Sequence, residues 1–369
     1  MSIVAIEIPK LTPKKLKAMI ADPAKSAEAV NLVYVNDHDP GINRLRKGKG
    51  FTYKLENKTV SDQAQLKRIR SLVIPPAWEN VWICKLPDGH LQATGLDKLK
   101  RKQYRYHNMW TVIRNHTKFF RLYEFGDALP TIRLQLEKDL SLPGLSHDKV
   151  LALVVSLMER TNIRVGNNAY EKLYGSFGLT TLKDQHVEFA GNKMKFSFKG
   201  KKGVHHDISI TSKKLARLVK QCQDIPGKEL FQFYNENGEA HTIDSGMVNA
   251  YLKKISGKDF TAKDFRTWAG TVQALLAFKD IGFADTATAT KQNVVQVLDT
   301  VSSHLGNTRT VCKKYYVHPL VLDLYESRSL EKYLDELDAI EKHDNRSGLT
   351  VEEKLLMKIL EKEAGSIKA

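Results

Sequence analysis

Two adjacent tyrosines, Tyr315 and Tyr316, follow two lysines in the stretch GNTRTVCKKYYVHP, residues 306–319. A tyrosine hydroxyl can act as a nucleophile, but its unperturbed pKa near ~10 makes it a poor one at neutral pH. Nearby positive charge would favour the reactive phenolate. Taken alone, the pair has three possible roles: packing, contact with a nucleic acid, or nucleophilic attack by one of them.

Three cations stand in unusual sequence settings. Arg164 follows a largely apolar helical pattern in NIRVGNN, and Arg266 lies inside another in DFRTWAG. Lys201 falls in the turn GKKG, between two segments with the alternation of strands. Each one alone is better explained by a salt bridge or a solvated surface, since charges near a core need partners. Together they could converge on one phosphate, where arginines stabilise the non-bridging oxygens and a lysine protonates the leaving oxygen.

The chain carries a large excess of positive charge. Its 369 residues include 58 Lys and Arg against 42 Asp and Glu, a net charge of +16. Residues 330–369 hold 7 basic and 10 acidic side chains, a charge of −3, which leaves +19 for residues 1–329. This excess favours a polyanionic partner that binds before residue 330. Residues 330–369 are predicted to form an acidic helical tail that packs against the main body.

Several other kinds of chemistry lack their motifs. The sequence contains no GxxxxGK[ST] phosphate loop, no HExxH and no cysteine–histidine cluster with zinc spacing, so no cofactor and no metal site is expected. The segment NDHDPG, residues 36–41, is better explained by a turn than by a cation site. No apolar run approaches ~20 residues, which argues against a membrane. The first residues do not resemble a signal peptide, and the three separated cysteines are typical of a reducing compartment, so we expect a cytoplasmic location.

The chemistry-bearing residues must be positioned by two kinds of structure. Strand signals dominate residues 29–106, with strands predicted at AVNLVYVND, GFTYKL and NVWICKL and one helix near DQAQLKRIRSL. Helical periodicity follows in SHDKVLALVVSLMERTNIR, GMVNAYLKKI, AKDFRTWAGTVQALLAF and ATKQNVVQVLDTVSSHL. A β segment at about residues 185–210 interrupts the helices and carries Lys201 at a hairpin tip. We predict an α+β fold: a small, mainly β domain over residues 1–110, then a mainly helical domain over residues 111–369 with a small antiparallel sheet.

Four segments in a fixed order resemble those of type IB DNA topoisomerases, especially the short viral and bacterial branch. They are NIRVGN, FKGKKG, KDFRTWAGT and LGNTRTVCKKYYVHP, and the likeness extends to RIRSLVIPPAW and LQATGLDKLKRKQYRYH. The resemblance implies a tyrosine that attacks a DNA phosphodiester to give a 3′-phosphotyrosyl link and a free 5′-hydroxyl. Rotation then relaxes supercoils before the strand is rejoined, without ATP or an essential metal. It also implies a monomer that clamps duplex DNA, associated with the nucleoid if the host is bacterial.

The resemblance assigns roles to single residues. Arg164 and Arg266 match the two arginines that clamp the phosphate, and Lys201 matches the hairpin lysine that protonates the 5′ oxygen. Many members have a histidine nine residues before the nucleophile. That position is Asn307 here, which makes Tyr316 the nucleophile. Because asparagine cannot be cationic, its role would be a neutral hydrogen bond to a phosphate oxygen.

The neighbouring residues are given simpler roles. Tyr315 is predicted to pack or to contact the DNA backbone. His304 is predicted to lie on a helix surface, and His205 and His206 to be an ordinary strand pair. No residue in the sequence is identified as a base for the nucleophile.

The segment RKQYRY in the first domain lies in the DNA major groove in the family. We therefore expect Gln103, Tyr104 and Tyr106 to approach bases or phosphates, and Arg101 and Lys102 to contact the DNA backbone. On a strand the two tyrosines would share one face. A solvated edge strand is the alternative.

Two other functions are weighed against a topoisomerase. A tyrosine recombinase also has an LG dipeptide, a histidine and a tyrosine nine residues later. Recombinases usually carry a histidine three residues before the second arginine, where this chain has Lys263, and their first domain is helical. A DNA-binding protein without catalysis would not need the complete set of cations with a tyrosine.

Overall fold

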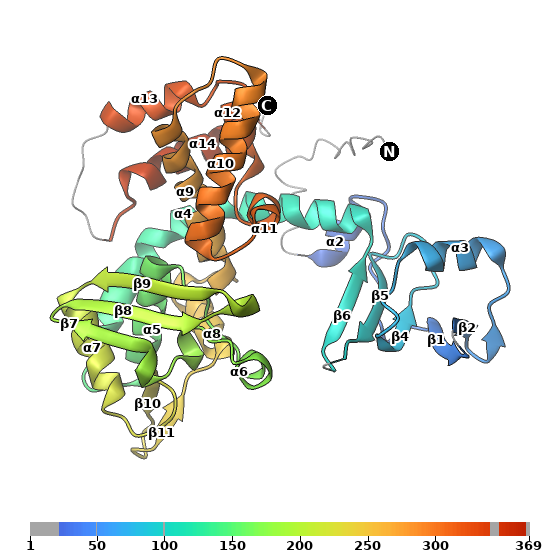
Figure 1. Cartoon of the computed structure of the whole chain (residues 1–369), viewed down its shortest axis with the longest axis horizontal. Helices are drawn as coiled ribbons and strands as arrows, with labels where there is room; N and C mark the ends of the chain where they lie inside the picture. The colour runs from blue at the N-terminus through green and yellow to red at the C-terminus, as the bar shows by residue number, and fades with distance from the viewer. Residues whose placement is uncertain (1–21, 49, 99, 340–346, 367–369) are drawn as a thin grey trace. The chain divides into compact units, whose positions relative to one another are not determined.

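The computed structural model describes residues 22–48, 50–98, 100–339 and 347–366, so the predicted first domain begins outside the described residues (Figure 1). The chain forms two compact units, and the division between them falls after Arg121, inside a long helix. The first unit is built mainly of strands and the second mainly of helices with small sheets. The α+β fold predicted from the sequence is confirmed.

One antiparallel sheet dominates the first unit, with the strand order β3-β2-β1-β4-β5-β6. Ile42, Ile83 and Ala93 of this sheet pack against Ile69 of the helix α3. The helix α3 confirms the helix predicted at DQAQLKRIRSL. Asp62 caps it by accepting hydrogen bonds from backbone N–H groups of its first turn. In chain order the elements are α2 (Pro23–Glu28), β1 (Ile42–Lys47), β2 (Gly50–Leu55), β3 (Lys58–Thr59), α3 (Gln63–Ser71), β4 (Glu79–Ile83), β5 (Leu91–Leu96), β6 (Lys102–Tyr106) and α4 (Asn108–Asp139), which continues into the second unit.

The strand predicted at AVNLVYVND is wrong. In this segment Val33 forms only an isolated bridge to Gly89. The apolar side chains serve separate packing sites: Val30 and Leu32 join a cluster with Trp110, whereas Val35 belongs to another. The apolar, β-branched composition of this segment therefore reflects burial of its side chains. It does not indicate the hydrogen-bonded pairing of a strand.

Helices form most of the second unit, and the helices predicted from periodicity are confirmed as α5, α8, α9 and α10. Every residue of α5 from Lys149 to Met158 is buried, as expected of a helix at the centre of a core. Among the described residues, none of the helices is long and apolar enough to span a membrane. In chain order the elements are α5 (His147–Thr161), α6 (Asn168–Tyr174), η1 (Leu179–Thr181), η2 (Asp184–His186), β7 (Val187–Ala190), β8 (Lys193–Lys199), η3 (Lys201–Gly203), β9 (His205–Thr211), α7 (Lys213–Gln223), β10 (Gln232–Tyr234), β11 (Ala240–Thr242), α8 (Ser245–Ser256), α9 (Ala262–Ile281), α10 (Ala287–Leu305), α11 (Arg309–Tyr315), α12 (Pro319–Glu326), α13 (Glu331–Ala339) and α14 (Val351–Ser366).

The predicted hairpin is present as β8 and β9 of the antiparallel sheet β7-β8-β9. Along β8 the buried Met194, Phe196 and Phe198 alternate with more exposed polar residues, as the sequence pattern predicted. The turn between the strands is closed by a 2.7 Å hydrogen bond from the backbone N–H of Gly200 to the carbonyl of Val204. The short helix η3 forms the tip.

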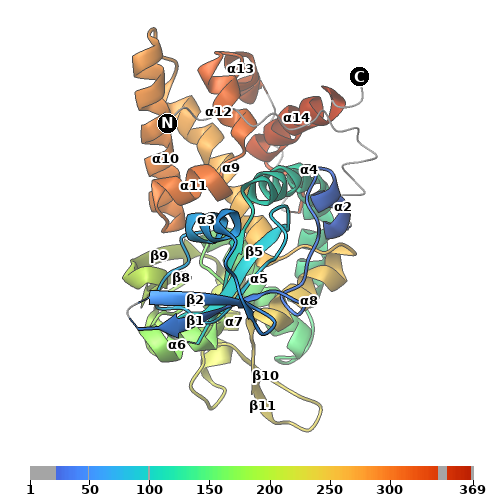
Figure 2. The same cartoon turned by 90° about the vertical axis from the view of Figure 1, so that its right-hand side faces the viewer.

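The C-terminal tail packs into the core of the second unit, as predicted. Leu355, Leu356 and Ile359 of α14 are buried in the same cluster as α5 and α9. Figure 1 and Figure 2 agree in grouping α12, α13 and α14. The described part of the tail up to Lys362 thus belongs to the helical unit.

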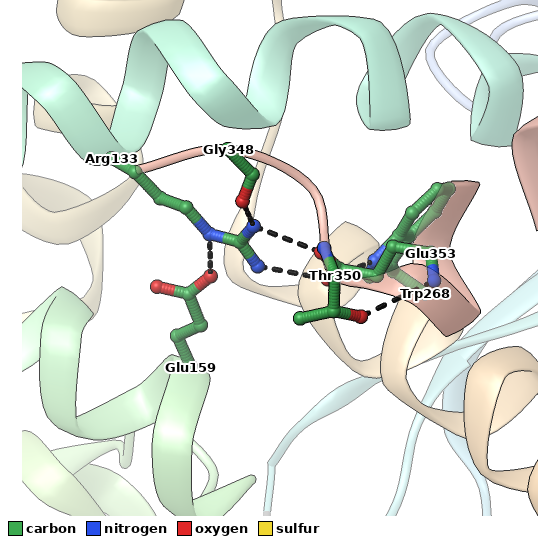
Figure 3. A network of polar contacts seen from close by, with 6 residues as sticks. All are labelled: Arg133, Glu159, Trp268, Gly348, Thr350 and Glu353. Atoms are coloured by element: carbon green, nitrogen blue, oxygen red, sulfur yellow. Dashed lines mark hydrogen bonds and ion pairs between the residues drawn. The ribbon is translucent and has the colours of Figure 1, made fainter. Parts of the chain in front are cut away.

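A buried polar network holds α14 in place (Figure 3). Both carboxylate oxygens of Glu353 accept hydrogen bonds from Arg133 of α4, at 2.8 and 2.9 Å. Trp268 of α9 donates its indole N–H to the same carboxylate at 2.9 Å, and Glu159 of α5 accepts a further hydrogen bond from Arg133. Four helices therefore meet where Glu353 is both ion-paired and hydrogen-bonded, which is the arrangement that a buried carboxylate requires.

Candidate active site

A pocket of about 540 Å³ in the second unit is lined by four of the predicted catalytic residues. They are Arg164, Lys201, Arg266 and Tyr316. The fifth, Asn307, accepts a hydrogen bond from Arg164. Residues separated by about 150 positions in the sequence are thus brought to one place.

Arg164 is held just beyond the end of α5. The helix ends at Asn162, which adopts a left-handed conformation with φ 55° and turns the chain toward the pocket. The guanidinium of Arg164 donates to the carbonyl of Gly306 at 2.9 Å and to the side chain of Asn307. Burial, together with repulsion from Arg266, lowers the pKa of Arg164 to about 10, so the side chain remains charged at neutral pH.

Arg266 is a buried residue of α9, with only 5% of its surface exposed. Its guanidinium donates to the carbonyl of Asn162 and, at 2.7 Å, to the carbonyl of Leu305. These carbonyls lie at the ends of α5 and α10, where helix carbonyls lack partners within the helix and attract positive charge. Arg266 therefore joins two helix ends while its side chain lines the pocket.

The charge of the two arginines is not balanced by protein carboxylates. Within the described part of the chain, neither Arg164 nor Arg266 forms a salt bridge with Asp or Glu, and the buried Nε of Arg266 has no hydrogen-bond partner. A buried cation beside a half-buried one, with no acid to balance them, is costly in a protein interior. The pocket is therefore suited to an anion.

Tyr316 follows the last residue of α11, and its ring lies beside Arg266, with 5.2 Å between the guanidinium carbon and the ring centroid. Thr271 of α9 holds the backbone at this point: its hydroxyl lies 3.2 Å from the carbonyl of Tyr316 and accepts from the backbone N–H of His318. The preceding residue, Gly270, allows this close approach. A Cβ there would lie 2.8 Å from the Tyr316 carbonyl oxygen.

Lys201 lies at the start of η3 and is exposed. Its ammonium nitrogen is 5.6 Å from the ring centroid of Tyr170 on α6. Its neighbour Lys202 takes the left-handed conformation, with φ 62°, and does not line the pocket. The turn thus directs only one of its two lysines to the pocket.

The sequence analysis missed several residues that shape this site. Tyr170 and Lys263 line the pocket, and Gly270 and Thr271 support Tyr316. In the sequence, NIRVGN and KDFRTWAGT stand out for their arginines, and Lys263 stands out only as a difference from recombinases. His304 is exposed on α10 as predicted, and its ring contacts the side-chain amide of Asn162 at 3.0 Å.

The five residues predicted to contact DNA lie together in the first unit, on or beside the edge strand β6. Tyr104 and Tyr106 stack on each other at 5.8 Å between ring centroids, which confirms that they share one face. Both are exposed, at 47% and 36%.

The polar members of this group have partners within the protein. Arg101 and Gln103 both bind the carboxylate of Asp97, and Lys102 forms a salt bridge with Asp37. Attraction from Lys102 opposes the effect of burial and lowers the pKa of Asp37. The turn predicted at NDHDPG is present, and within the described residues no cluster of His, Cys, Asp and Glu is suited to a metal.

Comparisons with known proteins identify the family to which the sequence is similar. Residues 100–345 match the family model of the eukaryotic DNA topoisomerase I catalytic core, and residues 50–97 match that of the bacterial DNA topoisomerase IB N-terminal domain. DNA topoisomerase 1B of Acanthamoeba polyphaga mimivirus is 30% identical over 295 residues, covering 78% of this chain and 88% of that relative. DNA topoisomerase I of Monkeypox virus and DNA topoisomerase 1B of Vaccinia virus (strain Copenhagen) are each 22% identical over 296 residues, covering 77% of this chain and 90% of each relative.

Proposed function

The chain belongs to the type IB DNA topoisomerases, and we propose that it relaxes supercoiled duplex DNA through a transient covalent bond between Tyr316 and one strand. It is an isomerase that acts on DNA. The observation that supports the covalent mechanism is the pair Arg164 and Arg266, which have no carboxylate partner among the described residues, with Arg266 beside the Tyr316 ring. A DNA phosphodiester supplies the anion that this arrangement lacks.

In the proposed cleavage step, the hydroxyl oxygen of Tyr316 attacks phosphorus and forms a new oxygen–phosphorus bond. The bond from phosphorus to the 5′ oxygen breaks. The phosphate then links the 3′ end of the cleaved strand to Tyr316. Lys201 gives a proton to the departing 5′ oxygen, and the tyrosine proton passes to solvent. Rejoining is the reverse reaction, so bond energy is conserved and ATP is not needed.

The remaining residues act on the phosphate in this scheme. Arg164 and Arg266 stabilise the negative charge that develops on the non-bridging oxygens. Asn307 has a side-chain N–H₂ group that can donate a neutral hydrogen bond to one of these oxygens, while its carbonyl oxygen accepts from Arg164. The contact with Arg164 occupies the carbonyl end of the amide, and the N–H₂ end, which lies 3.5 Å from the carbonyl of Leu305, is the end proposed to meet the phosphate.

DNA outside the cleaved phosphate would be bound by the first unit. The stacked Tyr104 and Tyr106 offer an exposed aromatic surface, and Arg101, Lys102 and Gln103 offer polar contacts. We propose that a single copy of the chain clamps the duplex. Binding through Arg101 and Lys102 would exchange their internal carboxylate partners for phosphates.

Relaxation of a supercoiled plasmid in EDTA without ATP tests the proposal. The wild-type chain should convert the plasmid to relaxed topoisomers, and Tyr316→Phe should not. A strict need for Mg²⁺ or ATP would overturn the mechanism. A requirement for two defined DNA sites, with exchange of strands between them, would instead favour a tyrosine recombinase.

A further inference from the structure

His206 of β9 lies between two glycines that precede residues of the site. A Cβ on Gly200 would lie 2.6 Å from Cδ2 and Nε2 of His206, and a Cβ on Gly306 would lie 2.4 Å from its Cε1. The imidazole therefore fills the space beside both glycine Cα atoms. The ring also stacks on Phe198, its partner on β8, at 5.1 Å between centroids. The sequence interpretation of His206 as an ordinary strand residue overlooked this position.

We propose that His206 is a positioning residue that sets the distance between the turn carrying Lys201 and the loop carrying Asn307. The inference rests on the proposed function. Lys201 directly follows Gly200 in the sequence, and Asn307 directly follows Gly306. A ring packed against both glycines ties the backbone of the proton donor to the backbone of the phosphate-binding loop.

The hydrogen bonds of the turn do not provide this link. The backbone N–H of Gly200 donates to the carbonyl of Val204 at 2.7 Å, and the carbonyl of Gly200 accepts from the N–H of Gly203 at 3.1 Å. Both bonds lie within the turn. They fix the shape of the tip, but not its distance from the loop at residues 306–307. Proton donation depends on that distance, because a displacement of ~1 Å can cost on the order of 10²-fold in rate.

The charges around His206 favour a packing role over phosphate binding. Burial lowers the pKa of His206, and repulsion from Arg164, Arg266 and His205 lowers it further. The imidazole is therefore neutral at neutral pH and adds no third cation to the two arginines. What it contributes is a flat, rigid ring in a narrow gap.

A substrate with sulfur at the 5′ bridging position distinguishes misplaced proton donation from general damage. Thiols have pKa values near ~8.5, so a 5′ thiolate leaves without a proton donor. His206→Ala should cleave ordinary DNA about tenfold to a hundredfold more slowly than wild type. It should cleave the 5′-thio substrate at nearly the wild-type rate. His205→Ala is the matched control, because His205 is the exposed neighbour on the same strand, and both rates should stay normal.

Gly200→Ala provides a second test that does not remove the ring. The backbone at Gly200, with φ −90°, accepts alanine, and the new methyl group collides with the His206 ring. This variant should also be slow on ordinary DNA and restored on the 5′-thio substrate. In the double variant Gly200→Ala/His206→Ala the collision is absent, so its rate should match that of His206→Ala alone and not the product of both losses.

The outcomes separate the inference from the proposed function. Without a covalent adduct in the wild-type chain, the proposed function itself fails. If wild type and His205→Ala cleave normally and His206→Ala does too, only the positioning role is overturned. It is also overturned if His206→Ala is equally slow on both substrates while Lys201→Ala is rescued by sulfur. If His206→Ala does not fold, as judged by thermal unfolding, the Gly200→Ala result decides by the same criteria.

Discussion

The guanidinium carbon of Arg266 lies 5.2 Å from the centroid of the Tyr316 ring. A cation at this distance from an aromatic ring is attracted to it, and more strongly when both groups are shielded from water. Hydrogen bonds to the carbonyls of Asn162 and Leu305 hold the guanidinium in place. In the proposed reaction, one side chain therefore orients the nucleophile and also binds the phosphate.

The two adjacent tyrosines should differ in covalent trapping. Tyr316 lines the pocket, whereas Tyr315 is 37% exposed and does not. Tyr316→Phe should abolish the DNA adduct in a denaturing gel, and Tyr315→Phe should retain it. Loss of the adduct only in Tyr315→Phe would show that the register of the nucleophile is off by one residue.

Lys201 and Arg266 should respond differently to a 5′-thio substrate. Lys201→Ala should cleave ordinary DNA slowly but recover on the thio substrate, because a thiolate leaves without a proton. Arg266→Ala should be slow on both, since charge on the non-bridging oxygens develops in either case. Lys202→Ala is the control at the same tip and should lose little. Rescue of Arg266→Ala without rescue of Lys201→Ala would assign the proton to the arginine.

Loss of the Thr271 hydroxyl should slow cleavage, because this hydroxyl contacts the backbone of Tyr316. Its hydroxyl accepts from the backbone N–H of His318 and lies 2.8 Å from the carbonyl of Thr267 and 3.2 Å from that of Tyr316, so the two carbonyls share its one proton. Thr271→Val removes the hydroxyl that accepts from the buried N–H of His318 and contacts the Tyr316 carbonyl, so we expect a loss of about 1–3 kcal/mol in unfolding free energy and a slower cleavage step. Thr300→Val on α10 is the matched control, because that exposed hydroxyl bonds the carbonyl four residues earlier. Equal effects in both variants would contradict a specific role for Thr271.

Glu353 should make stability depend on acid pH. Burial alone would raise the pKa of Glu353, but hydrogen bonds and attraction from Arg133 hold it below the ordinary value of 4.5. Since the pKa of Glu353 is lower in the folded state than in the unfolded chain, its contribution to the unfolding free energy is fully present above pH 4.5. It is lost as the pH falls through the folded-state pKa. Glu353→Gln should cost on the order of 3–5 kcal/mol near neutral pH and flatten the acid dependence in chemical denaturation. The exposed Glu361→Gln on the same helix should change neither quantity.

Lys102 should contribute to the salt dependence of DNA binding. If it neutralises one phosphate, Lys102→Gln should reduce the log–log slope of affinity against salt by about 0.9. Lys354→Gln, on the exposed face of α14, is the control and should leave the slope unchanged. Fluorescence anisotropy with a short duplex measures both slopes. An unaltered slope in Lys102→Gln would place this lysine away from the DNA backbone. Deleting the tail is not an equivalent control, because Leu355 and Leu356 belong to the core.

Local patterns were sufficient to predict much of the fold. The alternation of Met194, Phe196 and Phe198 identified β8, and the glycines around Lys201 identified the turn that follows it. Apolar periodicity identified the helices that carry or precede the two arginines. These features depend on neighbours within a few residues, which a single sequence contains.

Contacts between distant segments could not be predicted in the same way. The run at AVNLVYVND has strand composition, but its side chains are buried at separate sites. Nothing local to Arg266 indicates that it binds the carbonyls of Asn162 and Leu305. The ring of His206 lies against Gly200 and Gly306, which are about 100 residues apart in the sequence. Only the folded chain shows this contact.

The placement of α14 has a consequence for a chain that is still being synthesised. Ribosomes deliver the chain from the N-terminus, so Tyr316 emerges before the helix Val351–Ser366 exists. Until then, Arg133 and Trp268 lack the carboxylate of Glu353, and the core of the second unit lacks Leu355 and Leu356. A chain that stopped before α14 would thus carry every residue of the proposed reaction but would lack part of the core that α5 and α9 share. We therefore expect the proposed reaction to depend on α14, although none of its described residues lines the pocket.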